Sequence, residues 1–228
     1  MNTDKRRQFF LGVDLGKVHD YSAIAVVERA EVTGAWDPVV YSYRKEVALR
    51  LRYLERVALG TPYPEVAERV TRVARSRELM DRCQMAVDAT GVGRAVVDLI
   101  RLARPGCQVM PVVVTGGEKE SSVDGYYGVP KKDLIVGLQV MLQMGELEVA
   151  AGLKHYEDLL AEMAAVEVRV TQGGREQYGA RREGTHDDLV FAVALAVWGL
   201  RKSYPRGVGG YGWWQNEYQD DAKRLILF

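Results

Sequence analysis

The chain has 228 residues, of which 47% are apolar, and this fits one large domain with a sizeable buried core. Its 31 lysines and arginines balance its 31 aspartates and glutamates, so no protein-wide field attracts nucleic acid and any DNA contact must come from a local patch. Cys83 and Cys107 lack the paired spacing of a zinc site and indicate a reducing compartment. The longest uncharged apolar run, 189–200, is too short to span a bilayer, so we expect a cytoplasmic protein without a membrane segment.

The first half of the chain alternates between strand and helix patterns. Apolar, partly β-branched runs at 9–13 and 21–28 flank a short polar stretch at 16–20, which predicts a β-hairpin. A third strand is expected around 39–47, and helical spacing of apolar residues follows the prolines at 62 and 64. Strand, helix and strand are then expected over 84–87, 93–104 and 108–114. This order predicts a mixed sheet that opens as an antiparallel meander and continues with a right-handed parallel crossover.

The second half begins with a polar, glycine-rich stretch at 115–129, which predicts a surface loop. Pro130 then suits the first position of a helix whose apolar face carries Leu134 and Leu138. A further helix, a β-hairpin around Gly173 and Gly174, and a helix that is apolar on every side are expected over 154–164, 166–184 and 189–200. We expect one domain over 1–202 and a loosely held aromatic tail over 203–228.

Four acids stand where these apolar elements end or begin. Asp14 ends the first strand, Asp88 ends the strand in "MAVDATGVG", and Asp187 and Asp188 open the apolar helix in "THDDLVFAVALAVW". Carboxylates gathered within about 5 Å of one another repel unless a divalent cation neutralises them. Oxygen ligands favour Mg²⁺ or Mn²⁺ over zinc, and two such ions can catalyse phosphodiester hydrolysis. The pattern therefore indicates nuclease chemistry.

Each acid also has a purely structural explanation. Asp14, two residues before a glycine, suits a turn, and Asp88 can cap the turn over 90–93. Thr185 and Asp188 match a capping box at a helix start, where the helix dipole favours an acid without any metal. These alternatives are open for each residue alone, whereas the joint pattern favours an active site.

Four blocks in order carry a resemblance to a known family. They are "LGVDLGKVHDYSAIAVVE", "VDATGVGRAVVDLI", "GVPKKDLIVGLQVMLQMGELEV" and "EGTHDDLVFAVALAVW". Over about 9–202 the sequence resembles the nuclease domain of the large terminase subunit of tailed bacteriophages, a branch of the ribonuclease H-like superfamily. The resemblance implies an α/β fold, with a ribonuclease H-like mixed β-sheet flanked by helices and an auxiliary β-hairpin. It also implies an endodeoxyribonuclease that cuts concatemeric viral DNA during genome packaging, by two-metal hydrolysis and with little sequence specificity.

The resemblance also assigns roles to residues. It implies that Asp14, Asp88 and Asp188 are catalytic ligands of two Mg²⁺ or Mn²⁺ ions, with Asp187 as a further ligand and Asp20 as an auxiliary acid. His186 can serve beside them as a proton shuttle or as a bystander. Basic residues near the predicted helix start and hairpin can contact DNA phosphates or be solvated charges. These basic residues are Lys131, Lys132, Arg175, Arg181 and Arg182.

The sequence departs from a complete large terminase because it contains no phosphate loop of the form GxxxxGK[ST]. Either the chain is therefore an excised or separately encoded nuclease domain, or the family's packaging role does not transfer intact. The expected partners are double-stranded DNA and a separate packaging ATPase, small terminase subunit or portal protein, in the host cell cytoplasm if the gene is viral. A Holliday junction resolvase-like nuclease is an alternative, although the hairpin and the "VPKKDL" block favour terminase. A catalytically silent module that binds DNA or a portal is another. A sugar kinase or chaperone ATPase needs two such domains and a longer chain.

Overall fold

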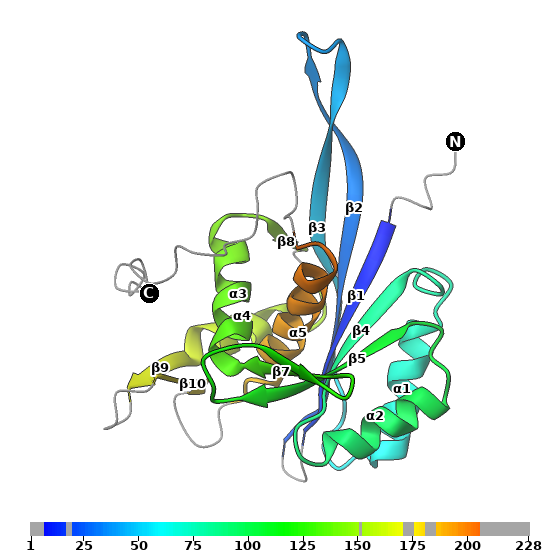
Figure 1. Ribbon diagram of the computed structural model, residues 1–228, viewed down its shortest axis with the longest axis vertical. Coiled ribbons are helices and arrows are strands. Elements are labelled where there is room, and N and C mark those ends of the chain that lie inside the picture. Colours follow the sequence, from blue (N-terminus) through cyan, green and yellow to red (C-terminus); the bar gives the residue numbers. More distant parts are fainter. Residues whose placement is uncertain (1–6, 17–19, 151, 171–175, 181–185, 206–228) are drawn as a thin grey trace.

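The computed structural model describes residues 7–16, 20–150, 152–170, 176–180 and 186–205. Its main feature is a sheet of eight strands with helices on both faces (Figure 1). The strands are β1 (Arg7–Asp14), β2 (Ala23–Asp37), β3 (Ser42–Arg56), β4 (Cys83–Asp88), β5 (Gln108–Thr115), β6 (Ser121–Val123), β7 (Tyr126–Pro130) and β8 (Leu147–Val149). They lie in the order β6-β7-β5-β4-β1-β2-β3-β8. The pairs β1–β2, β2–β3 and β6–β7 are antiparallel and the others parallel, so the predicted mixed sheet is confirmed.

Five helices cover the two faces of this sheet within the described residues. They are α1 (Tyr63–Ala74), α2 (Gly93–Leu102), α3 (Lys131–Gln143), α4 (Tyr156–Ala165) and α5 (Asp188–Ser203). Alternate side chains of a strand point to opposite faces. Accordingly Phe9 and Leu11 pack with α1 and α2 on one face, while Phe10 packs with α5 on the other. Helix α5 lies directly on the sheet and is buried on every side, as predicted, because α3 and α4 cover it.

The prediction of a surface loop over 115–129 is wrong, because strands β6 and β7 occupy much of this stretch. Strand β7 pairs in parallel with β5, which gives Val129 a fully buried place in the core. Pairing with a distant strand therefore outweighs the polar, glycine-rich local pattern. The third strand also begins and ends later than expected, at Ser42 and Arg56, and the short strand β8 beside it was not expected.

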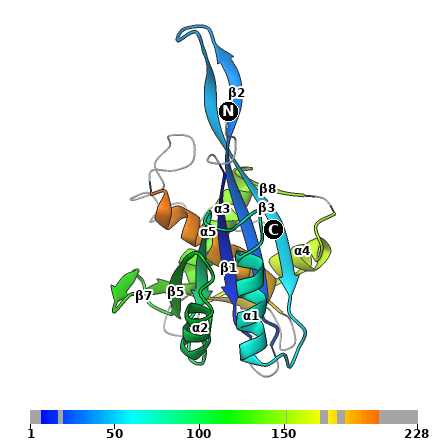
Figure 2. The ribbon, with the colours of Figure 1, turned by 90° about the vertical axis from the view of Figure 1, so that its right-hand side faces the viewer.

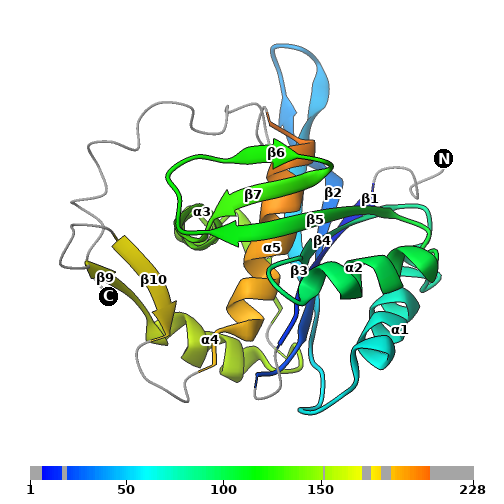
Figure 3. The ribbon, with the colours of Figure 1, turned by 60° about the horizontal axis from the view of Figure 1, so that its bottom comes forward.

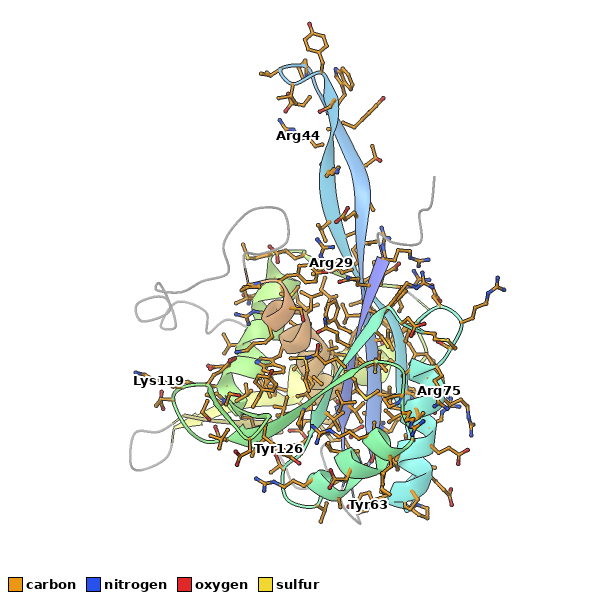
Figure 4. The ribbon with its side chains drawn as sticks, turned by 45° about the vertical axis from the view of Figure 1, so that its right-hand side comes forward. Arg29, Arg44, Tyr63, Arg75, Lys119 and Tyr126 are labelled. Carbon is orange, nitrogen blue, oxygen red and sulfur yellow. The ribbon has the colours of Figure 1, made fainter. Side chains whose placement is uncertain are left out.

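Strands β2 and β3 continue far beyond the sheet. Only Ala23–Ala30 of β2 pairs with β1, so the distal part of the hairpin projects from the body as a two-stranded extension (Figures 1 and 2). Arg44 lies near its tip and Arg29 near its base (Figure 4). The exposed ring of Trp36 packs edge-to-face on Tyr43, with centroids 5.2 Å apart. A two-stranded ribbon is only marginally stable in water, so such contacts are needed to hold the tip in shape.

The auxiliary β-hairpin is present as β9 (Val166–Val170) and β10 (Glu176–Ala180), an antiparallel pair apart from the main sheet (Figure 3). Arg175, Arg181 and Arg182 lie outside the described residues, so their contact with DNA stays a prediction.

At the other end of the domain, α5 stops at Ser203, and the ring of Tyr204 packs on Phe10 with centroids 6.2 Å apart. Residues 206–228, most of the expected tail, also lie outside the described part. No described helix has the length and apolarity needed to cross a membrane.

Helix α5 and strand β1 approach so closely that only glycine fits between them. A Cβ added to Gly12 would lie 1.8 Å from the carbonyl oxygen of Ala192 and 2.5 Å from the amide nitrogen of Ala196. Both atoms belong to the helix backbone and cannot move aside cheaply. The contact fixes the distance between the end of β1 and the start of α5.

We expect Gly12→Ala to destabilise the fold by about 3 kcal/mol, since overpacking against backbone is costly. For a domain of this size, the melting temperature should fall by roughly 6 to 12 °C. Gly199→Ala is the matched control, because its Cβ would meet only the Ala86 side chain at an ordinary 3.6 Å. That change lies within α5 and should be neutral or add up to about 1 kcal/mol of helix propensity. Equal melting temperatures for the two variants would contradict this packing.

Candidate active site

Asp14 and Asp88 end two adjacent parallel strands at the same edge of the sheet. Val13 of β1 pairs with Val87 of β4, and the two acids are the next residues on each strand. Because side chains alternate, Asp14 shares the face of Gly12, the face that α5 covers. Asp88 shares the face of Ala86, which stands two residues before it and packs in the same core as α5. Both carboxylates are therefore directed to the side of the sheet on which α5 lies.

Helix α5 begins with the other two acids. Asp188 is its first residue and only 4% exposed, while Asp187 precedes it as the N-cap. Consecutive helical residues point about 100° apart, and the two carboxylates do go to different partners. Asp188 Oδ2 accepts a hydrogen bond from Arg56 Nε at 2.8 Å, and Asp187 Oδ2 pairs with Lys131 Nζ at 3.2 Å. The helix start thus presents two acids that are each held by a cation.

The Asp14 carboxyl group is electrostatically coupled to the other three acids. Burial is the main cause that raises the pKa of Asp14 well above its ordinary value. The negative charges of Asp88, Asp187 and Asp188 raise it further, and the ammonium of Lys131 opposes them. Acids that are separated in the sequence therefore act together on the Asp14 carboxyl group.

Asp88 also has the turn role that its sequence allows. Its Oδ1 accepts the Thr90 backbone N–H at 2.8 Å, and a Cβ added to Gly93 would lie 2.3 Å from the Asp88 carbonyl oxygen. Helix α2 therefore starts tightly against the end of β4. The hydrogen bond helps to orient the Asp88 carboxylate, so the turn role and a ligand role do not exclude each other.

The four carboxylates fit a hard divalent cation. They offer only oxygen donors, and a cation among them would offset the repulsion that adds to burial in raising the pKa of Asp14. In the described part of the chain, no three acid, histidine or cysteine side chains already surround a single metal position. Asp187 pairs with Lys131, and Asp188 pairs with Arg56. A metal ion would therefore compete with these two cations for the carboxylates.

Two residues of this site were missed from the sequence, Arg56 and Glu162. Arg56 ends β3 and pairs in register with Ala23, which itself pairs with Asp14, so all three lie in one row across the sheet. Glu162 of α4 is 5% exposed and binds the guanidinium of Arg56. Burial raises its pKa to about 7, and the charge of Asp188 adds to this, against the Val190 N–H and Arg56.

Glu162 also supplies the cap of α5. Its Oε2 accepts the backbone N–H groups of Leu189 at 2.9 Å and Val190 at 3.1 Å. Thr185, expected to take part in a capping box, lies outside the described residues. The available signal was an acid three residues after buried Leu159, that is, on the buried side of a helix.

The other predicted residues lie partly in the candidate site and partly outside it. Lys131 belongs to the site, and its ammonium also lies 4.3 Å from the centroid of the Phe191 ring. Lys132 pairs with Glu118 at the surface. Asp20 is exposed before β2, so its auxiliary role stays a prediction. His186 packs edge-to-face on the ring of Tyr21, with centroids 4.9 Å apart, and its Nδ1 lies 3.8 Å from Asp188 Oδ1.

Solved structures with a similar fold include nucleases of large terminases. The large terminase nuclease from thermophilic phage G20c with bound magnesium matches at a TM-score of 0.57 and 22% identity, over 84% of this chain and 81% of that one. The K428A mutant nuclease domain of the large terminase subunit gp2 of bacterial virus Sf6, solved with manganese and beta-thujaplicinol, matches at 0.56 and 15%, over 83% and 87%. The fold is therefore ribonuclease H-like, as predicted.

A longer protein shares this fold in part. The HK97 bacteriophage large terminase matches at a TM-score of 0.52 and 12% identity, over 85% of this chain but only 39% of that protein. No protein-family model matches the sequence, and no curated protein matches it either.

The raised pKa of Asp14 predicts a pH-dependent penalty in the absence of metal. A folded-state pKa above the unfolded value of about 3.9 means that the fold loses stability as pH rises between the two values. In chelator at pH 7, Asp14→Asn should therefore melt about 2 to 4 °C above the wild type, the effect of roughly 1 kcal/mol. The difference should vanish near pH 4, and added Mn²⁺ should stabilise only the wild type.

The control for this measurement is Asp98→Asn, which changes an exposed acid on α2. Its melting temperature should follow the wild type at every pH and with Mn²⁺. If Asp14→Asn instead melts below the wild type in chelator, Asp14 is a structural turn residue and not part of a repulsive cluster.

Proposed function

We propose that this chain is a metal-dependent DNA endonuclease of the terminase large-subunit type, which cuts concatemeric double-stranded DNA during genome packaging. The observation that carries the proposal is the gathering of four carboxylates from three separate elements at one sheet edge, where burial and the charges of the other three raise the pKa of Asp14. The ribonuclease H-like fold supports it, since magnesium and manganese accompany two of the similar nucleases. In the proposal Asp14, Asp88 and Asp188 are the catalytic ligands, and Asp187 is a further ligand.

The chemistry follows from what these side chains offer. Two Mg²⁺ or Mn²⁺ ions bound by the acids would activate the attacking water and stabilise the leaving oxygen of a phosphodiester. Asp14 and Asp88 are anchored by the sheet and Asp188 by the first turn of α5, so their relative positions are set by the fold. Lys131 places a positive charge beside Asp187, where it can attract a DNA phosphate.

Sequence preference should be weak in this proposal. The acids and Lys131 act on phosphate groups, and phosphate contacts position DNA without reading its bases. Because the sequence contains no GxxxxGK[ST] motif, packaging would need an ATPase outside these 228 residues, together with a small terminase subunit or a portal protein. We place this activity in the host cell cytoplasm.

The purified chain should nick or linearise plasmid DNA with Mg²⁺ or Mn²⁺ and stop when a chelator is added. Asp188→Ala should lower the cleavage rate at least 100-fold, about 2.7 kcal/mol of transition-state stabilisation, because it removes a ligand. Asp187→Ala should lower the rate clearly less, since Asp187, which pairs with Lys131, is only a further ligand in the proposal. Initial rates under saturating Mn²⁺ measure both effects.

Melting curves must accompany these rates, so that loss of folding is not read as loss of catalysis. Asp98→Ala, on the surface of α2, should cleave at the wild-type rate. Activity that persists in chelator would overturn the metal-dependent proposal. A strong preference for four-way junctions over linear duplex would favour the resolvase-like alternative, and a larger loss in Asp187→Ala would exchange the roles of the two neighbours.

A further inference from the structure

The guanidinium of Arg56 bridges two buried carboxylates. It donates from Nε to Asp188 at 2.8 Å and from Nη2 to Glu162. The side chain of Arg56 is 17% exposed, and those of the two acids are 5% exposed. Charges buried this deeply are costly unless they are paired and hydrogen-bonded, so the three side chains depend on one another.

This bridge is tied to the backbone of α5 as well as to its side chain. One oxygen of Glu162 accepts the N–H groups of Leu189 and Val190, while its other oxygen binds Arg56. The first turn of α5 and the Asp188 carboxylate are therefore held by the same two residues. These two residues come from β3 and α4, elements that contribute none of the four clustered acids.

The guanidinium of Arg56 also contacts an aromatic ring. Its guanidinium carbon lies 5.1 Å from the centroid of the Tyr21 ring, a distance at which a cation and an aromatic face attract. A planar guanidinium that is held by two carboxylates and a ring has little freedom to turn. Lysine cannot reproduce this geometry, because an ammonium group is a point charge without a planar fork.

We propose that Arg56 and Glu162 form a positioning pair that holds one oxygen of Asp188, Oδ2, and so leaves Oδ1, which lies 3.8 Å from His186 Nδ1, to face a divalent ion. This inference rests on the proposed function, because it assumes that Asp188 is a metal ligand. Neither Arg56 nor Glu162 touches the metal or the substrate. Their effect is on the orientation of a ligand and therefore on metal affinity.

The test is calorimetric titration of the full chain with Mn²⁺, at a temperature well below the melting point of each variant. We expect Arg56→Lys to weaken Mn²⁺ binding by about 10- to 100-fold, the usual effect of losing a group that orients a ligand. Glu162→Gln, which keeps the shape and an oxygen for the N–H groups, should weaken it similarly. The double variant should bind about as weakly as either single variant, since the two residues act as a unit.

Arg50→Lys is the matched control, because Arg50 lies on the same strand and donates from Nε to Glu148 at 2.8 Å on the surface. It should bind Mn²⁺ with wild-type affinity. Cleavage measured against Mn²⁺ concentration adds a second readout: Arg56→Lys should need more Mn²⁺ for half-maximal rate and recover most of its rate at saturation. If Arg56→Lys fails to fold, the shape-conserving Glu162→Gln carries the same test.

The outcomes separate this inference from the proposed function. Wild-type Mn²⁺ affinity in folded Arg56→Lys and Glu162→Gln, with lowered melting temperatures only, would reduce the pair to a structural ion pair and leave the nuclease proposal standing. Failure of the wild-type chain to bind Mn²⁺ would overturn both. Weaker binding in both variants, with Arg50→Lys unchanged, supports the positioning role.

Discussion

The rest of the structure depends on the close packing of helix α5 on strand β1. At Gly12 the backbones approach until a single added Cβ would overlap with Ala192 and Ala196. Two residues further along β1 stands Asp14, and one turn before Ala192 the helix begins at Asp188. A helix that is apolar on every side has no other stable place than this buried position, so the hydrophobic effect brings the acids together.

Gathering acids in this way opposes folding, and the molecule offsets the cost locally. Lys131 pairs with Asp187, and Arg56 joins Asp188 to Glu162. Lys131 opposes the repulsion without abolishing it, and burial together with the charges of the other acids keeps the pKa of Asp14 raised. A group of acids that still repel one another, although cations pair with Asp187 and Asp188, is suited to accept further positive charge. A metal-dependent nuclease needs this property.

The sequence alone was sufficient to predict those residues of the candidate site whose signals are local. Asp14 and Asp88 end apolar strands and Asp188 begins an apolar helix, and a transition from buried to polar sequence can be recognised within a few residues. Arg56 and Glu162 could not be found in this way. Arg56 meets Asp188 and Glu162 across separations of 132 and 106 residues, and only the completed fold brings the three side chains together.

The same difference between local and long-range signals explains which parts of the fold could be predicted. The antiparallel start, the parallel continuation and the buried last helix follow from periodicity, which is a property of single segments. Strand β7 does not, because its sequence looks like a polar loop until β5 offers it hydrogen bonds. The length of the β2–β3 hairpin was missed for a related reason, since its distal part packs on no core and carries no clear alternation of buried residues.

The central claim is that the fold brings these carboxylates together to bind metal. A crystal of the chain grown with Mn²⁺, with diffraction recorded at the manganese absorption edge, tests it most directly. The account predicts anomalous density among the carboxylates of Asp14, Asp88 and Asp188, with Arg56 still contacting the last of these. Manganese that binds elsewhere, or an acid cluster without anomalous density at saturating Mn²⁺, would contradict it.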